Sequence, residues 1–221
     1  LDYSFTTGAY SGTTEDKVSG YPGLLLGSAV FTADAAGATG KAGDKAINLT
    51  MKGGPVVSFN SAFLAKVNAA TANDELTVAF WQKKLDIADS SAFTMNSPGS
   101  GNNRGFHAHA PWSNQRIYFD TVGCCDGVTQ RIDAAIDTFP GYSGDSTWWT
   151  NAYHLFVFTK KGASKNIWID GKLFLSGEST AALPVDIDAF YMGSGANGGE
   201  QSHAIIDDFS VYGKELVEYQ K

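Results

Sequence analysis

The sequence is short of basic residues and of long apolar runs. Its 16 lysines and arginines are outnumbered by 23 aspartates and glutamates, and the formal net charge at pH 7 is −7. Nucleic-acid binding needs a basic stripe, which this balance does not supply. No stretch approaches the roughly 18 apolar residues of a membrane-spanning helix. We therefore expect neither a nucleic-acid partner nor a membrane span.

Cysteine is almost absent, because the only two are the neighbours Cys124 and Cys125. There is no Cys-x-x-Cys pair of the kind that binds zinc. An intrachain disulfide could join only these neighbours, and closing so small a ring gives almost no loop-entropy stabilisation. We expect a vicinal disulfide that fixes the shape of one loop tip, with two free thiols as the alternative.

Aromatic residues and glycine are plentiful, with 25 Gly, 14 Phe, 9 Tyr and 5 Trp. Short apolar or alternating runs separated by turn residues predict strands. One helix is predicted at 61–70 and one polar surface loop at 95–105. At 221 residues we expect a single domain, residues 1–221, of the all-β class: a two-sheet antiparallel β-sandwich or jelly roll. The predicted strands cover 75–82, 104–110, 116–121, 152–159, 166–170, 173–175, 187–192 and 204–212.

Several of these segments resemble a known family. Glu75–Trp81, Ala152–Phe158, Ile167–Leu173 and Ala204–Tyr212 occur in the order of a laminin-G-like jelly roll, within the concanavalin A-like lectin and glucanase fold. The stretch from Pro111 to Ile132, with its Cys-Cys pair, is similar to a bacterial subgroup of that family. The resemblance covers roughly residues 1–216. It implies two curved sheets, with glycans bound on the concave sheet or at the loop edge.

The resemblance also implies which enzymes to look for. Glucanases of this fold carry Glu-x-Asp-x-x-Glu, which supplies the two carboxylates of glycoside hydrolysis, and no such run is present. The fold's lyases carry a Tyr-Phe-Lys strand, whereas Tyr118-Phe119 is followed by Asp120. These absences favour binding without catalysis. A glycosidase or lyase that uses His107 or His109 with Tyr118 is an open alternative.

The candidate binding site lies on the hairpin 104–121. His107 and His109 are two residues apart and therefore share one face of a strand, as do Arg116, Tyr118 and Asp120 on the next. Sugar recognition needs aromatic faces for C–H groups and polar side chains for hydroxyls. The predicted ligand-binding residues are Arg104, His107, His109, Trp112, Arg116, Tyr118, Asp120, Cys124, Cys125, Arg131 and Trp148.

Some of these residues have a purely structural interpretation as well. The two histidines could simply hydrogen-bond neighbouring strands, and a metal site built on them needs a third ligand that the sequence does not specify. Asp120 could form a structural ion pair with Arg116 or Arg131. Adjacent strand residues point to opposite faces, so either Trp148 or Trp149 should lie outside or line a groove, and we take Trp148 as that residue.

Calcium is the expected cofactor, because domains of this fold commonly hold Ca²⁺ away from the glycan site. Asp207 or Asp208 on the last strand would meet Asp2 on the first, and the predicted metal ligands are Asp2 and Asp207. The alternative is that Asp207 and Asp208 hydrogen-bond the backbone.

The sequence thus predicts non-catalytic binding of a polysaccharide or oligosaccharide. We expect a carbohydrate-binding module, a monomeric domain of a larger secreted or cell-surface bacterial protein. An arginine pair, Arg104 and Arg131, would suit an acidic or sulfated glycan, while a neutral ligand stays open. The alternative function is an adhesion or protein-interaction domain.

Overall fold

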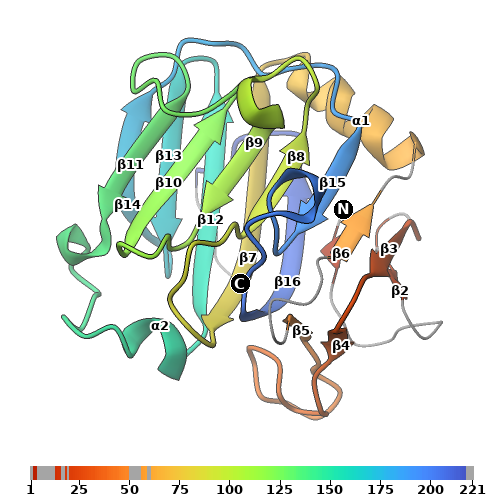
Figure 1. Cartoon of the computed structure of the whole chain (residues 1–221), viewed down its shortest axis with the longest axis vertical. Helices are drawn as coiled ribbons and strands as arrows, with labels where there is room; N and C mark the ends of the chain where they lie inside the picture. Colours follow the sequence, from red (N-terminus) through yellow and green to blue (C-terminus); the bar gives the residue numbers. More distant parts are fainter. Residues whose placement is uncertain are drawn as a thin grey trace.

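A computed structural model describes residues 2–3, 13–15, 18, 20–49, 56–58 and 61–217 of the chain. Two antiparallel sheets stack face to face, and we call them the front and back sheets after their positions in Figure 1. This confirms the predicted two-sheet antiparallel sandwich. Within the described residues, no helix has the length and apolar character needed to cross a membrane.

The front sheet has the order β11-β10-β9-β8-β15-β6-β3-β2, and every neighbouring pair is antiparallel. The hairpin of β9 and β10 lies next to the edge strand β11 and carries most of the predicted site. The front strands are β2 (Thr13–Glu15), β3 (Pro22–Leu25), β6 (Val56–Ser58), β8 (Phe93–Asn96), β9 (Arg104–His109), β10 (Arg116–Thr121), β11 (Arg131–Ala135) and β15 (Ala189–Met192).

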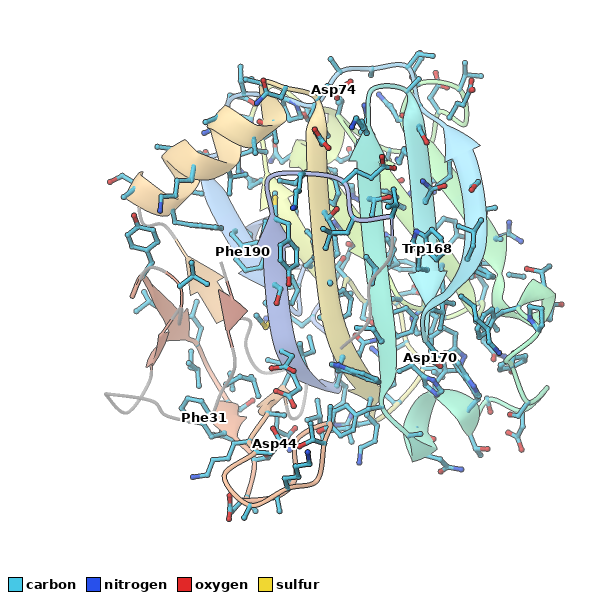
Figure 2. All side chains as sticks on the ribbon, turned by 180° about the vertical axis from the view of Figure 1, so that it is seen from behind. Phe31, Asp44, Asp74, Trp168, Asp170 and Phe190 are labelled. Atoms are coloured by element: carbon cyan, nitrogen blue, oxygen red, sulfur yellow. The ribbon has the colours of Figure 1, made fainter. Side chains whose placement is uncertain are left out.

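The back sheet has the order β14-β13-β12-β7-β16-β5-β4, and β1 also pairs with β16. Figure 2 shows this sheet from behind, with Trp168 on it. The back strands are β1 (Asp2–Tyr3), β4 (Ala29–Phe31), β5 (Ile47–Leu49), β7 (Glu75–Lys84), β12 (His154–Lys161), β13 (Ser164–Ile169), β14 (Lys172–Glu178) and β16 (Ala204–Tyr212).

Phenylalanines from both sheets form the core between them. Phe80 of β7 stacks on Phe209 of β16 with ring centroids 5.3 Å apart and meets Phe93 of β8 edge to face at 5.9 Å. All three rings are fully buried. A buried Phe→Ala substitution typically costs about 3–5 kcal/mol, so this aromatic cluster fixes how the sheets stack.

The helices are few and short. Helix α1 (Ser61–Thr71) covers one end of the sandwich (Figure 1), and α2 (Trp148–Asn151) precedes β12. Single 3₁₀ turns occupy Gly101–Asn103, Ile136–Thr138 and Ala196–Gly198. The predicted helix and all predicted strands are present, with ends shifted by a few residues. The predicted loop at 95–105 is wrong at its ends, because Met95 belongs to β8 and is buried, and β9 begins at Arg104.

Candidate functional site

Strand alternation on the β9–β10 hairpin places the polar side chains on the outer face of the front sheet. His109 lies opposite Tyr118 and His107 lies opposite Asp120 in the strand register. The residues between them point inward, and all belong to the core: Phe106, Ala108, Ile117 and Phe119. The predicted shared face of His107, His109, Tyr118 and Asp120 is therefore confirmed.

A pocket of about 320 Å³ opens on this outer face. It lies over β9 and β10 and is bordered by the loop that follows β10. Seven of its lining residues are among those predicted from the sequence, and two, Asn102 and Glu200, are not. The lining residues are Asn102, Arg104, His109, Trp112, Tyr118, Cys124, Cys125, Arg131 and Glu200.

Asp120 is the charged centre beneath the pocket and is fully buried. Its carboxylate accepts hydrogen bonds from Arg104 Nη1 at 2.8 Å, from Arg131 Nε at 2.5 Å and from Arg131 Nη2 at 2.7 Å. Burial opposes the positive charge of Arg131, but the bonds and charge of Asp120 outweigh it and raise the pKa of Arg131. The structural ion pair considered for Asp120 thus exists with Arg131, and Arg104 joins it. Buried charges are held only where they are paired in this way.

Glu200 completes the charge balance of the pocket. It comes from the loop between β15 and β16, where its backbone is left-handed with φ of 51°. Its carboxylate accepts from Arg104 Nη2 at 2.9 Å and from the Ser91 hydroxyl at 2.6 Å. Two arginines and two carboxylates therefore meet in one network. No sequence pattern marks Glu200, because it lies in a loop 80 residues beyond Asp120.

The aromatic wall of the pocket is formed by Trp112, Tyr118 and His109. Trp112 lies in the turn between β9 and β10, which is closed by Trp112 N–H donating to Arg116 O at 3.0 Å. Its ring meets His109 edge to face with centroids 4.4 Å apart. The Arg131 guanidinium lies 4.6 Å from the centre of the Tyr118 ring, a cation–π contact. Trp112 and Tyr118 are half-buried and line the pocket, so part of each side chain is accessible to a ligand.

His107 and His109 form the floor beneath these rings. Their Nε2 atoms are 3.1 Å apart, and both side chains are buried. Burial, followed by the nearby charges of His109 and Arg104, holds the pKa of His107 well below its ordinary value. Burial and then Arg104 lower the pKa of His109 to about 4. Both rings are neutral at pH 7 as a result.

The loop after β10 brings the two cysteines to the pocket rim. Val122 N–H and Gly123 N–H donate to Gly105 O and Arg104 O, at 3.1 and 2.8 Å, and so tie the loop to β9. Cys125 has a left-handed backbone with φ of 80°, an unusual conformation for a residue with a side chain. Both cysteines are thiols in the structure, so the vicinal disulfide stays a prediction. Burial raises the pKa of the Cys124 thiol, and Asn102 Nδ2 donates to its sulfur at 2.9 Å.

Two predicted site residues lie away from the pocket. Trp148 was expected to be outward on a strand, and this is wrong: it starts helix α2, is 9% exposed and stacks on His154 with centroids 3.5 Å apart. Arg116 does share the outer face, but it is ion-paired with Asp133 of β11 and does not line the pocket. The charge of Arg116 is thus paired with a carboxylate on the neighbouring strand β11 and does not face the pocket.

The predicted calcium ligands, Asp2 and Asp207, lie on neighbouring strands but not opposite each other. Strand β1 does pair with β16, but the register sets Asp2 opposite Ser210, and the Asp2 side chain lies outside the described residues. Asp207 is buried and accepts from Ala38 N–H at 2.7 Å and Asp208 N–H at 2.8 Å, so its backbone-bonding role is present. Burial, and then the negative charges of Asp208 and Asp44, raise the pKa of Asp207 to about 6. A carboxylate oxygen is a ligand that suits a hard cation such as Ca²⁺, and calcium binding by Asp207 stays a prediction.

The fold and the polar outer face together define a laminin-G-like jelly roll. A family model described as the concanavalin A-like lectin/glucanases superfamily, of the laminin G type, matches residues 58–220. The chain belongs to this family. No curated protein matches the sequence.

Several solved structures share the fold. The receptor binding domain of botulinum neurotoxin C/D mosaic serotype superposes with a TM-score of 0.66 at 16% identity. Binding domains of botulinum neurotoxin DC, one in complex with rat synaptotagmin II and one with SialylT, superpose with TM-scores of 0.65 and 0.63, both at 14% identity. Each match covers 98% of this chain and 48% of the other, so the chain spans about half the length of these structures. Identity this low shows a shared fold alone.

Proposed function

We propose that the chain binds a polysaccharide or oligosaccharide in the pocket over β9 and β10 and does not cleave it. The observation that carries the proposal is that two aromatic side chains, Trp112 and Tyr118, line the same pocket as a fixed set of hydrogen-bonding groups around Asp120. Sugar rings present C–H faces and hydroxyl edges, which match these two kinds of group. The pocket volume of about 320 Å³ suits one or two sugar residues of a longer chain.

The charge balance favours a neutral glycan. Arg104 and Arg131 each donate to Asp120, and Arg104 also donates to Glu200. An acidic sugar would have to compete with carboxylates that already hold these guanidinium groups. Charged hydrogen-bonding groups that are already paired still serve neutral hydroxyls well, because arginine has five donors and each carboxylate several acceptor sites.

Catalysis is disfavoured by the orientation of the histidines. A general base must reach its proton within hydrogen-bond distance. His109 Nδ1 donates to Ser90 O at 3.0 Å, and its Nε2 points at His107. The Nε2 atoms of His107 and His109 lie 3.1 Å apart, so each lone pair faces the other ring instead of a ligand beside Tyr118, and the His–Tyr alternative has little support.

We propose in addition that the domain acts outside the cell, as a module of a larger secreted or surface protein. Two fold neighbours are described as binding domains, one in complex with SialylT and one in complex with rat synaptotagmin II. Domains of this fold therefore bind a protein as well as SialylT. A protein-interaction role is therefore the second candidate. The compact polar pocket supports glycan binding more than a broad protein interface, which needs a larger apolar area.

A glycan array with neutral, uronic and sulfated polysaccharides tests the proposal. We expect retention of a neutral glycan that persists at 0.5 M NaCl, where screened charge pairs weaken, and no new reducing or unsaturated ends after incubation. If the protein retains only acidic glycans, the proposal that its ligand is neutral is wrong. Binding to no glycan would contradict the function.

A further inference from the structure

The hydrogen bonds of His107 and His109 place the lone pairs of their two Nε2 atoms face to face. Thr94 has one hydroxyl proton and donates it to Ser194 O at 2.9 Å. The 2.7 Å contact between Thr94 Oγ1 and His107 Nδ1 therefore takes its proton from the histidine. A neutral His107 with its proton on Nδ1 has a bare lone pair on Nε2.

His109 also carries its proton on Nδ1, because of a different hydrogen-bond partner. His109 Nδ1 lies 3.0 Å from Ser90 O, a carbonyl that can only accept, so His109 also carries its proton on Nδ1. The Nε2 atoms of the two rings are nevertheless 3.1 Å apart. The Ser91 hydroxyl, 3.4 Å from His107 Nε2, does not supply a proton between them, because it donates to Glu200 Oε2 at 2.6 Å.

We propose that His107 and His109 are the two protein ligands of a divalent d-block cation such as Zn²⁺, which binds to both Nε2 atoms. A cation at the usual 2.0–2.1 Å from two nitrogens that are 3.1 Å apart makes an angle of about 100°, close to tetrahedral. Zinc-ligating histidines usually donate their other ring N–H to a carbonyl or an oxygen partner, as both of these do. A cation also removes the repulsion between two buried lone pairs.

The surroundings supply the remaining requirements of the site. An Asp120 carboxylate oxygen and one ring nitrogen of each histidine lie within 4.8 Å of one another, so Asp120 is near enough to hold a zinc-bound water. Arg104 and Arg131 oppose positive charge at His107, whereas Glu200 and Asp120 favour it at His109, so the two carboxylates offset the arginines only on the His109 side of the site. His109 lines the pocket, which gives the ion a route from solvent. Asp120 thus takes part in the site through a water and is not a third direct ligand.

Zinc binding by the full chain, stripped of metal and without any glycan, tests the proposal separately from the proposed function. Calorimetric titration with Zn²⁺ should give one site per chain. His107→Gln and His109→Gln should each weaken binding at least tenfold, whereas the matched control His203→Gln, at a half-buried histidine paired with Asp86, should leave it unchanged. The double variant Cys124→Ser/Cys125→Ser should also keep the site. Loss of binding in the cysteine variant, or no binding by the wild-type chain, would overturn the proposal.

A measurement on the unsubstituted protein guards against misfolded variants. Nitrogen-15 NMR of the four histidines should show Nδ1–H tautomers for His107 and His109 without metal. Zinc should then shift the Nε2 resonances of these two alone. An Nε2–H tautomer at either residue together with no zinc-dependent shift would overturn the proposal.

Discussion

Replacing Asp120 by Asn tests whether one buried carboxylate organises the pocket. The carboxylate is fully buried and holds Arg104 and Arg131 through three charged hydrogen bonds. Removing one partner of a buried ion pair typically costs about 3–5 kcal/mol. We expect the low end, about 3 kcal/mol, because Arg104 keeps Glu200 and the two arginine side chains retain 12% and 16% exposure.

The matched control is Asp133→Asn on the neighbouring strand. Asp133 also pairs with an arginine, Arg116, but their side chains are 27% and 38% exposed. An exposed pair contributes about 1 kcal/mol or less. For a chain of this size, each kcal/mol shifts Tm by about 2–4 °C, so Asp120→Asn should lower Tm by about 6–12 °C and Asp133→Asn by no more than about 4 °C.

Thermal unfolding followed by circular dichroism, in metal-free buffer, measures both variants. Glycan affinity of the folded fraction should fall at least tenfold for Asp120→Asn, since its arginines lose their fixed positions, and should stay unchanged for Asp133→Asn. Equal Tm shifts for the two variants, with glycan binding intact in both, would refute the reasoning.

Two further predictions concern the pocket rim and the calcium ligands. Replacing Cys124 and Cys125 by Ser should lower glycan affinity severalfold but change stability by only about 0.5 kcal/mol, as expected for a surface loop; a sharp fall in Tm with binding intact would make the pair structural. Adding 1 mM Ca²⁺ should raise the Tm of the wild-type chain and of Asp86→Asn, but not of Asp207→Asn, because a bound ion stabilises only the state that holds it. Differential scanning fluorimetry with an EDTA control measures this, and an equal response from all three proteins would place calcium elsewhere.

The strands and the shared face of the site were predictable from the sequence, because side-chain alternation is a local property. The final strand was predicted at 204–212 and is Ala204–Tyr212. On the hairpin, the inward positions are apolar and the outward ones polar, so the pattern alone places His107, His109, Tyr118 and Asp120 together. Core packing fixes this choice, since shifting a strand by one residue would turn the polar side chains into the apolar layer between the two sheets.

The parts that the sequence did not reveal depend on loops and on local turns. Glu200 reaches the pocket through a loop with no periodic pattern. Trp148 looked like a strand residue beside Trp149, but Asp145 begins a helical turn there: its carbonyl accepts from Trp148 N–H at 3.0 Å, and its carboxylate accepts from Thr147 N–H at 2.8 Å. These contacts turn both indoles into the core. The sequence pattern put Asp120 on the same face as the histidines, but only the strand register shows that it lies directly opposite His107.

The central claim, that the pocket over β9 and β10 binds a glycan, is tested most directly by removing one ring face. Affinity for the array-selected glycan should be measured by calorimetry for Trp112→Ala, Trp112→Phe and the control Trp168→Ala, whose indole lies on the back sheet (Figure 2). We predict a loss of tenfold or more for Trp112→Ala, about 1.4 kcal/mol, partial retention for Trp112→Phe and full retention for Trp168→Ala. Unchanged affinity in folded Trp112→Ala, or an equal loss in Trp168→Ala, would contradict the claim.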